Sequence, residues 1–405
     1  MDRPSRRWVA RKKLVVIALA AVLFWSLTYS ALRSPPRPAP LVQGRPLSAW
    51  ALDLNSPSAS ARENAAHLIG QLEADAVPTF VALLRTPEPL LARPVRWIGW
   101  RLPARLRDRL FRVADPSASA ARRIAGAHAL RIMGPRAEPA LPALARALRA
   151  DGTTAWHAAL ALAQLGQPGI TALSGALLQI SPANCGFACY ALRTLGQSAS
   201  NAVPALGQVL QTREVASAEP AARALTAIGP AAEPALIEAL SHPNAGIRAC
   251  ASRALGSMGP LGRGSLPRLL AVTQVDVDAN VRAAALQAAA EVDPNNDVLV
   301  PVLGQALMAP SRELRLRALG TVGHLPQLPS RLRTQLLWLL RDQAPEVRGS
   351  AAGLLGQIGR VEPNEQAQLE ELRQDANEWV RKQAEAALGR LTGPADEPAA
   401  KRPDP

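Results

Sequence analysis

The apolar positions follow a helical period through most of the chain. In the segment "IRACASRALGSMGP" (Ile247 to Pro260), small or aliphatic residues stand three, six and seven positions after an Arg, and Gly stands near position eleven. Most of these positions fall on one face of an α-helix. The same frame returns in Val281 to Pro294 and in Val347 to Arg360. The pattern predicts a series of similar amphipathic helices.

The frame recurs every 30–36 residues, with one gap of 61 residues that holds two units. Second apolar segments with Pro in their first turn lie between the frames, as in 137–148 and 201–210. Gly-Pro pairs at 134–135, 229–230 and 259–260 end the first helix of a unit. Each unit is therefore predicted to be a helix pair that buries its apolar stripe against the next pair. The anchor positions are Arg62, Arg123, Ala155, Cys185, Ala218, Arg248, Arg282, Arg312, Arg348 and Arg381.

The composition favours the same architecture. Hydrophobic residues make up 48% of the 405 residues, mostly Ala and Leu, whereas aromatic residues make up 3%. Closely packed helices suit this composition, and β-sandwiches or barrels do not, because they need β-branched and aromatic residues. We expect an all-α chain without strands.

The pattern "VRxxAAxxLxxxG" followed by "AxPALxxLL" resembles HEAT repeats, particularly the short kind found in phycocyanobilin lyases. The resemblance covers about 47–393 and implies an α-α superhelix, a HEAT-type solenoid. It also implies a structural ladder of turn Asp and helix Arg residues that hydrogen-bond along the stack. In this sequence the ladder matches Asp276 with Arg282, Asp342 with Arg348, and Asp375 with Arg381, and Arg248 holds the same helix position. Ala155, Cys185 and Ala218 break it, so the middle of the stack should be less regular.

The position five residues after each anchor points away from the apolar face. In HEAT proteins this helix lines the concave wall, so a partner site is expected there. A line of polar side chains at this position is usually only a solvated face. If the line binds a protein partner, Arg223, Arg253 and Arg317 are the strongest candidates in the array. The positions hold His67, His128, Tyr190, Arg223, Arg253, Gln287 and Arg317.

The N-terminal sequence predicts that the protein is anchored in a membrane. Residues 14–32 contain no charge and are long enough, at about 1.5 Å per residue, to cross a bilayer as one transmembrane helix. Six cations in 1–13 predict that this basic tail is cytoplasmic, which places the array on the outer side, periplasmic or extracellular. The alternative is a cleaved signal peptide and a secreted protein, although the apolar run is long for one.

The flanking segments have the composition of spacers. Residues 33–46 are rich in Pro and predict a semi-rigid extended linker between the anchor and the array. Residues 394–405 lack an apolar period and are expected to form a flexible tail.

Segment 85–113 departs from the repeat pattern. It holds eight Arg and two Trp, and it is either a degenerate repeat whose Trp97 and Trp100 fill the core or an exposed insertion. In the second case the two Trp, with Arg101 and Arg105, would form a surface suited to lipid headgroups or to an acidic partner.

The net charge of +14 does not by itself predict nucleic-acid binding. The basic excess comes from 1–45 and from 85–112, and the rest of the chain is neutral. Binding along a groove needs cations clustered on the bound face. We therefore expect no nucleic acid, and a binder acting through 85–113 remains the weakest alternative.

No constellation for catalysis or for a cofactor is present. The five His form no His-Glu pairs, so the metal ligands of HEAT-repeat deoxyhypusine hydroxylases are missing, and neither a phosphate loop nor a Gly-x-Ser-x-Gly motif occurs. Cys185, Cys189 and Cys250 are expected to be small buried side chains. The sequence favours a membrane-tethered, non-catalytic scaffold that binds a protein, without metal or cofactor. A lyase-like or other small-molecule enzyme using the concave groove is the alternative, and the oligomeric state is open.

Overall fold

The computed structural model describes residues 40–87, 116–150, 152–295, 298–325, 329–357 and 362–392. The chain divides into two compact units, 1–166 and 167–405. Almost all regular structure in the described residues is helical, as the sequence predicts.

Unit 1 contains six α-helices and one short hairpin within its described residues. Helices α2 and α3 pack on α7, α4 also packs on α7, and α7 packs on α9. The elements are β1 (Leu41–Val42), β2 (Arg45–Pro46), α2 (Leu47–Asp53), α3 (Ala59–Gly70), η1 (Ala74–Ala76), α4 (Val77–Leu84), α7 (Pro116–Met133), η3 (Gly134–Ala140), α8 (Leu141–Ala147) and α9 (Gly152–Gln164).

The hairpin differs from the expectation of an all-helical chain with an extended spacer over 33–46. Strands β1 and β2 pair antiparallel around Gln43 and Gly44, whose φ values of 51° and 75° suit the tight hairpin turn. The indole of Trp50 donates to the Val42 carbonyl at 3.1 Å, and Arg45 forms an ion pair with Asp53 at 3.0 Å. The end of the predicted spacer is therefore packed on the first helix pair.

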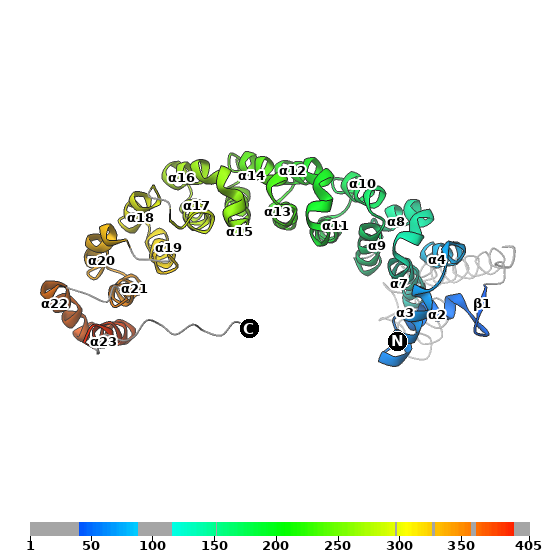
Figure 1. The fold of residues 1–405 in the computed structure, drawn as a ribbon, viewed down its shortest axis with the longest axis horizontal. Helices are drawn as coiled ribbons and strands as arrows, with labels where there is room; N and C mark the ends of the chain where they lie inside the picture. The colour runs from blue at the N-terminus through cyan, green and yellow to red at the C-terminus, as the bar shows by residue number, and fades with distance from the viewer. Residues whose placement is uncertain are drawn as a thin grey trace, which may run out of the picture. The chain divides into compact units, whose positions relative to one another are not determined.

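Unit 2 is a two-layer stack of helix pairs. In Figure 1 the odd-numbered helices from α11 to α21 form one row, and the even-numbered helices from α10 to α22 form the other. Each odd helix packs on the next odd helix and on the even helix beside it. The first half comprises α10 (Gln167–Ala176), α11 (Pro182–Leu195), η4 (Gly196–Ala202), α12 (Val203–Thr212), α13 (Val215–Ile228), η5 (Pro230–Ala232), α14 (Glu233–Ala239), α15 (Ala245–Ser257), η6 (Gly259–Ser265) and α16 (Leu266–Val275).

The second half of unit 2 repeats the arrangement and ends with α23 packed on α21. It comprises α17 (Ala279–Val292), α18 (Leu299–Leu307), α19 (Arg312–Gly323), η7 (Ser330–Leu332), α20 (Arg333–Leu339), α21 (Pro345–Leu355), α22 (Pro363–Glu371), η8 (Leu372–Gln374) and α23 (Glu378–Thr392).

The joints within the helix pairs use the Gly and Pro residues that the sequence places there. Gly229 and Gly259 end their helices with φ values of 88° and 56°, a conformation that disfavours side chains with a Cβ. A 3₁₀ turn follows, and the second helix begins with Pro at N1 or N2, as at Pro234 and Pro267. The predicted Gly-Pro helix ends are confirmed.

Small residues set the distance between neighbouring odd helices. A Cβ added at Gly256 of α15 would lie 2.7 Å from the Ala288 Cα of α17, and one at Gly356, after α21, would lie 2.6 Å from the Ala387 Cα of α23. The backbones therefore approach more closely there than any larger residue allows. By contrast, a Cβ at Gly320 of α19 would meet no atom within 4 Å.

We predict that Gly256→Ala destabilises unit 2 by about 1–3 kcal/mol, because overpacking forces α15 and α17 apart. Gly320→Ala is the matched control and should stabilise by up to about 1 kcal/mol, since Ala loses less backbone entropy in a helix. Urea unfolding followed by circular dichroism measures both. Equal effects of the two substitutions would show that the close approach does not control stability.

Candidate binding face and the ladder behind it

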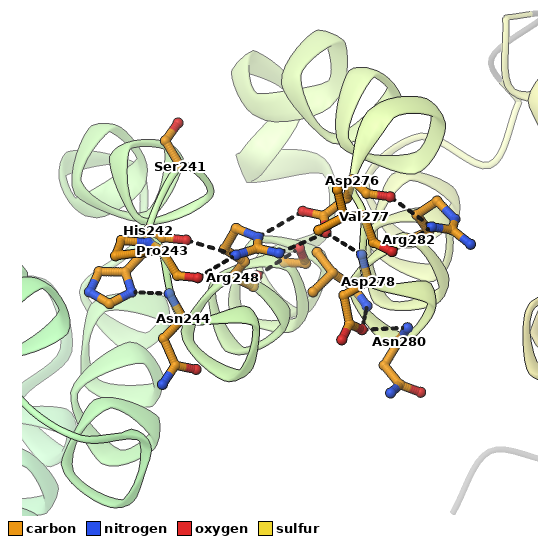
Figure 2. Close-up of polar contacts among 12 residues, drawn as sticks. Ser241, His242, Pro243, Asn244, Arg248, Asp276, Val277, Asp278, Asn280 and Arg282 are labelled. Atoms are coloured by element: carbon orange, nitrogen blue, oxygen red, sulfur yellow. Dashed lines mark hydrogen bonds and ion pairs between the residues drawn. The ribbon is translucent and has the colours of Figure 1, made fainter.

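Asp276, the C-cap residue of α16, links two helix pairs through its carboxylate. Arg248 of α15 donates from Nε to Oδ2 at 2.7 Å and from Nη2 to Oδ1 at 2.8 Å (Figure 2). The Arg248 side chain is 11% exposed and that of Asp276 is 7% exposed. A bidentate pair at this burial is stronger and less screened by salt than a surface ion pair.

The same turn binds the next repeat through its backbone. Arg282 of α17 donates from Nη1 to the carbonyls of Asp276 and Val277, and the Asp276 carboxylate also accepts from the Asp278 N–H (Figure 2). Each complete Arg of this kind thus donates to backbone carbonyls of the turn before its own helix and to the carboxylate of the following turn. We call this arrangement the ladder. Its ion pairs are Arg248–Asp276, Arg315–Asp342 and Arg348–Asp375.

The residues predicted for the ladder all take part in it, with Asp in the turns and Arg on the helices, but the partner of each carboxylate and one anchor of the repeat frame need correction. The carboxylate accepts from the Arg of the preceding repeat, as Asp375 does from Arg348. The Arg that follows the same turn donates instead to the backbone carbonyls, as Arg348 does to Asp342 and Arg381 to Asp375. The sequence spacing cannot distinguish the two partners, since both lie within reach of one turn.

The second correction concerns the anchor Arg312. Its place in the ladder is held by Arg315, which donates to the carbonyls of Ala309 and Pro310 and pairs with Asp342. Arg312 begins α19 and instead pairs with Glu346 at 2.7 Å, where both side chains are half exposed. The equivalent of Arg253 in this repeat is therefore Gly320, three residues beyond Arg317.

The ladder is interrupted where the turn carboxylate is missing. Ala309 stands at the position of Asp276 and Asp342, so within the described residues Arg282 has no carboxylate partner. In the middle of the array Ala218 replaces the ladder Arg, and Arg213 instead donates to the Ile180 carbonyl at 3.0 Å. The ladder is therefore broken at this position, as the sequence predicts, while α11 and α13 still pack closely on each other.

The ladder also sets the charge state of its carboxyls. The hydrogen bond from Arg348 holds the pKa of Asp375 below its usual range. Burial raises the pKa of Asp276, but the bonds from Arg248 and from the Asp278 N–H outweigh burial and lower the pKa overall. Both carboxyls are ionised at neutral pH.

The face opposite the packing stripe carries the side chains that the sequence singled out. We call the exposed side chains of α11, α13, α15, α17 and α19 on this side the inner face. Arg223 is paired with Glu219, and Arg317 with Glu313 at 3.2 Å, whereas Arg253 has no carboxylate partner among the described residues. The inner face comprises Tyr190, Arg193, Arg223, Arg253, Gln287 and Arg317.

Two hollows interrupt the inner face. One, of about 370 Å³, lies where α11, α13 and α15 meet and is lined by Arg193, Glu219, Arg223, Cys250, Arg253 and Ser257, among others. The other, of about 660 Å³, lies between α17 and α19 and is lined by Gln287, Glu291, Glu313, Arg317 and His324, among others. Sequence spacing brought out Arg223, Arg253 and Arg317 but neither Arg193 nor the hollows, which depend on how neighbouring helices pack.

The cysteines are buried and free, as expected for small core side chains. Burial raises the pKa of the Cys250 thiol, and hydrogen bonding with Cys185 followed by burial raises that of Cys189, whereas the hydrogen bond with Cys189 lowers the pKa of Cys185. Protonated thiols are weak nucleophiles and weak metal ligands. Within the described residues, no group of three or more His, Cys, Asp or Glu side chains is placed to hold a metal ion.

Two His rings stack between α7 and α9 in unit 1, a contact that the sequence did not predict. The ring centroids of His128 and His157 lie 4.6 Å apart, and the Arg131 guanidinium donates to His128 Nε2 at 2.9 Å. Burial first, and then the neighbouring positive charges, lower the pKa of each His from 6.5 to about 4. The pair is therefore neutral at physiological pH.

Several predicted residues lie outside the described residues. These are the anchor 14–32 and the surface candidates Trp97, Trp100, Arg101 and Arg105 in segment 85–113. In the portion of the chain that is described, no helix has both the length and the apolar character needed to cross a membrane.

Comparison with known proteins identifies the repeats. The family of HEAT repeats matches residues 203–290 and 300–389, which lie in unit 2. These two segments of the chain thus match HEAT repeats, and the described helices of unit 2 stack as an all-α helical solenoid. No curated protein matches the sequence.

Solved structures show the same class of fold. Kap121p bound to Nup53p is 13% identical at a TM-score of 0.52, covering 85% of this chain and 45% of that chain. Kap121p bound to the extreme C-terminus of the protein phosphatase Cdc14p is 13% identical at 0.52, covering 87% and 42%. The chain therefore spans less than half of Kap121p, and at this identity the likeness shows the fold alone.

Human deoxyhypusine hydroxylase is 23% identical over 63% of this chain and 96% of that chain, with a TM-score of 0.28. That score is too low for the resemblance to bear on fold or activity.

We predict that Ala309→Asp completes the ladder and stabilises unit 2 by about 1 kcal/mol, because Arg282 gains a carboxylate. Urea unfolding of a double-mutant cycle with Arg282→Gln isolates the pair. If Ala309→Asp stabilises the Arg282→Gln variant equally, the gain does not come from this ion pair.

We also predict that the helix pair α7–α9 loses stability as the pH falls from about 6.5 to about 4. The unfolded chain binds protons on His128 and His157 with ordinary pKa values near 6.5, whereas the folded pair binds them only near 4. Between pH 6.5 and about 4, proton binding therefore stabilises the unfolded chain relative to the folded one. The full stability is present above this pH range. Hydrogen exchange of 116–164 measures the effect.

Replacing both His128 and His157 by Gln should flatten this pH dependence, while His67→Gln, at an exposed position of α3, should leave it unchanged. An unchanged slope in the double variant would assign the effect to other groups.

Proposed function

We propose that this chain is a membrane-tethered, non-catalytic HEAT scaffold whose inner face binds a protein partner outside the cytoplasm. The observation that carries the proposal is the inner face itself, where exposed polar and aromatic side chains continue across successive odd helices of unit 2. Solenoids present long surfaces of this kind, and their specificity lies in scattered exposed residues.

Arg253 is the strongest single contact candidate. It is exposed, and no described carboxylate neutralises it, so it can pair with a partner group without breaking an existing ion pair. Arg223 and Arg317 each hold a Glu four residues earlier, and both members of these pairs are half exposed. Such pairs contribute little to stability, which leaves the Arg side chains available for binding.

The address in this proposal rests on the sequence. The uncharged run 14–32 and the six cations before it support a single anchor with a cytoplasmic N-terminus and an outer array. Secretion after signal cleavage is the alternative, and it places the array on the same side of the membrane.

One observation favours a second candidate function. The hollow between α17 and α19 has a volume of about 660 Å³, within the range of small-molecule sites, and includes His324 and two Glu residues. This candidate is a small-molecule site on the inner face. A saturable small ligand recovered with the purified chain would favour it over the scaffold.

We predict that Arg223→Gln/Arg253→Gln/Arg317→Gln removes most of the protein crosslinks formed by the chain in intact cells. Interface energy is concentrated in a few residues, and Arg is enriched among them. Crosslinking followed by mass spectrometry measures the yield.

The matched control is Arg263→Gln/Arg341→Gln/Arg373→Gln, which removes the same charge from exposed positions outside the inner face. Equal crosslink yields from the two triple variants, or no reproducible protein crosslink to the parent chain, would contradict the proposal.

A further inference from the structure

Three successive odd helices each contribute an Arg to the smaller hollow of the inner face. Arg193 comes from α11, Arg223 from α13 and Arg253 from α15, and all three line the same space of about 370 Å³. The sequence frame found only two of them, because Arg193 lies eight residues after its anchor rather than five. The fold thus collects cations that the repeat pattern does not align.

The charges in this hollow are unbalanced. Its lining holds three guanidinium groups and one carboxylate, that of Glu219, which pairs with Arg223. Among the described residues neither Arg193 nor Arg253 forms an ion pair with a carboxylate. The hollow therefore keeps an excess positive charge that a partner can neutralise.

One of the three cations, Arg193, is also oriented for hydrogen bonding. The Arg193 guanidinium lies over the Tyr190 ring, 5.0 Å from its centroid. Stacking of this kind holds the guanidinium plane while leaving its N–H edge free for a bidentate bond to a carboxylate. Cys250 and Ala254 belong to the lining and bring no charge that would compete, since burial keeps the thiol protonated.

The neighbouring part of the inner face has the opposite balance. The hollow between α17 and α19 is lined by Glu291 and Glu313 against Arg317, with Gln287 and His324 beside them. An acidic ligand should therefore bind at the hollow of α11, α13 and α15 and not at the hollow between α17 and α19. This contrast confines the preferred contact to one end of the face.

We infer that the hollow of Arg193, Arg223 and Arg253 binds an acidic, extended segment of the protein partner, which runs across α11, α13 and α15. This inference rests on the proposed function and adds the chemistry of the partner. Neighbouring packed helices lie about 8–10 Å apart. An extended chain in the polyproline II conformation advances about 3.1 Å per residue with three residues per turn, so every third side chain lies on the same side, about 9 Å from the last. Carboxylates at every third residue would therefore match the three Arg residues.

The test uses the full 405-residue chain in a mild non-ionic detergent and measures fluorescence anisotropy with labelled synthetic peptides. The probe is a peptide of about twelve residues, made of Glu-Gly-Ser units at the spacing above, and its counterpart has Gln in place of Glu. We expect the Glu peptide to bind at least tenfold more tightly than the Gln peptide, with a difference that shrinks as salt rises.

The variant Arg193→Gln/Arg223→Gln/Arg253→Gln should weaken the Glu peptide at least tenfold. The control Arg263→Gln/Arg341→Gln/Arg373→Gln, with the same charge change, should leave it within about twofold. Circular dichroism of both variants checks that the helices remain intact.

Three results would overturn the inference: equal binding of the Glu and Gln peptides, no binding of either, or equal weakening by the two triple variants. Tighter, steeply salt-dependent binding of a single-stranded oligonucleotide to the same three Arg residues would also overturn it and assign the hollow to nucleic acid. If any of these occurs while crosslinks in cells still depend on Arg223, Arg253 and Arg317, the scaffold proposal stands and only the acidic partner is wrong.

Discussion

A helix pair built mainly from Ala, Leu and Gly cannot bury its apolar stripe alone, because it has too few large side chains to form a core of its own. It becomes stable only where a second pair approaches closely enough to exclude water. Contacts such as Gly256 with Ala288 show how this constraint selects residues: the side chain at the contact must be absent or nearly so. The abundance of small residues follows from the stacking.

Close approach alone does not determine the order in which the helix pairs stack. The ladder determines that order. Each ladder Arg donates to carbonyls of its own turn and to the carboxylate of the following turn. It therefore joins repeats in sequence order, as Arg348 joins the turns at Asp342 and Asp375. Because the stripe and the ladder occupy the packed side and the turns, the opposite side of each odd helix is left free. The inner face is the consequence, and its residues are not needed to hold the stack.

The sequence predicted the helix pairs and their Gly and Pro joints, because both depend on spacing within one repeat. The ladder residues followed from the resemblance to HEAT repeats, which did not give the Arg partner of each carboxylate. The predicted frame placed the anchor of this repeat at Arg312, whereas the structure has Arg315 in that position. A shift of three residues along a helix returns to nearly the same face, so the apolar pattern fits either Arg. The sequence also missed the hairpin at 41–46 and the convergence of Arg193 with Arg223 and Arg253. These features depend on contacts between segments, which a repeat frame does not contain.

Stabilisation by neighbours is tested most directly by removing the last pair, α22 and α23, from a chain that ends at residue 357. Hydrogen exchange would then be measured along the remainder of unit 2. The account predicts that protection falls most in α21, which loses its packing on α23 and the Arg348–Asp375 ion pair, and next in α20, whose Arg333 loses its ion pair with Glu365. The loss should fade toward α11. A uniform loss of protection across unit 2, or none in α21, would contradict it.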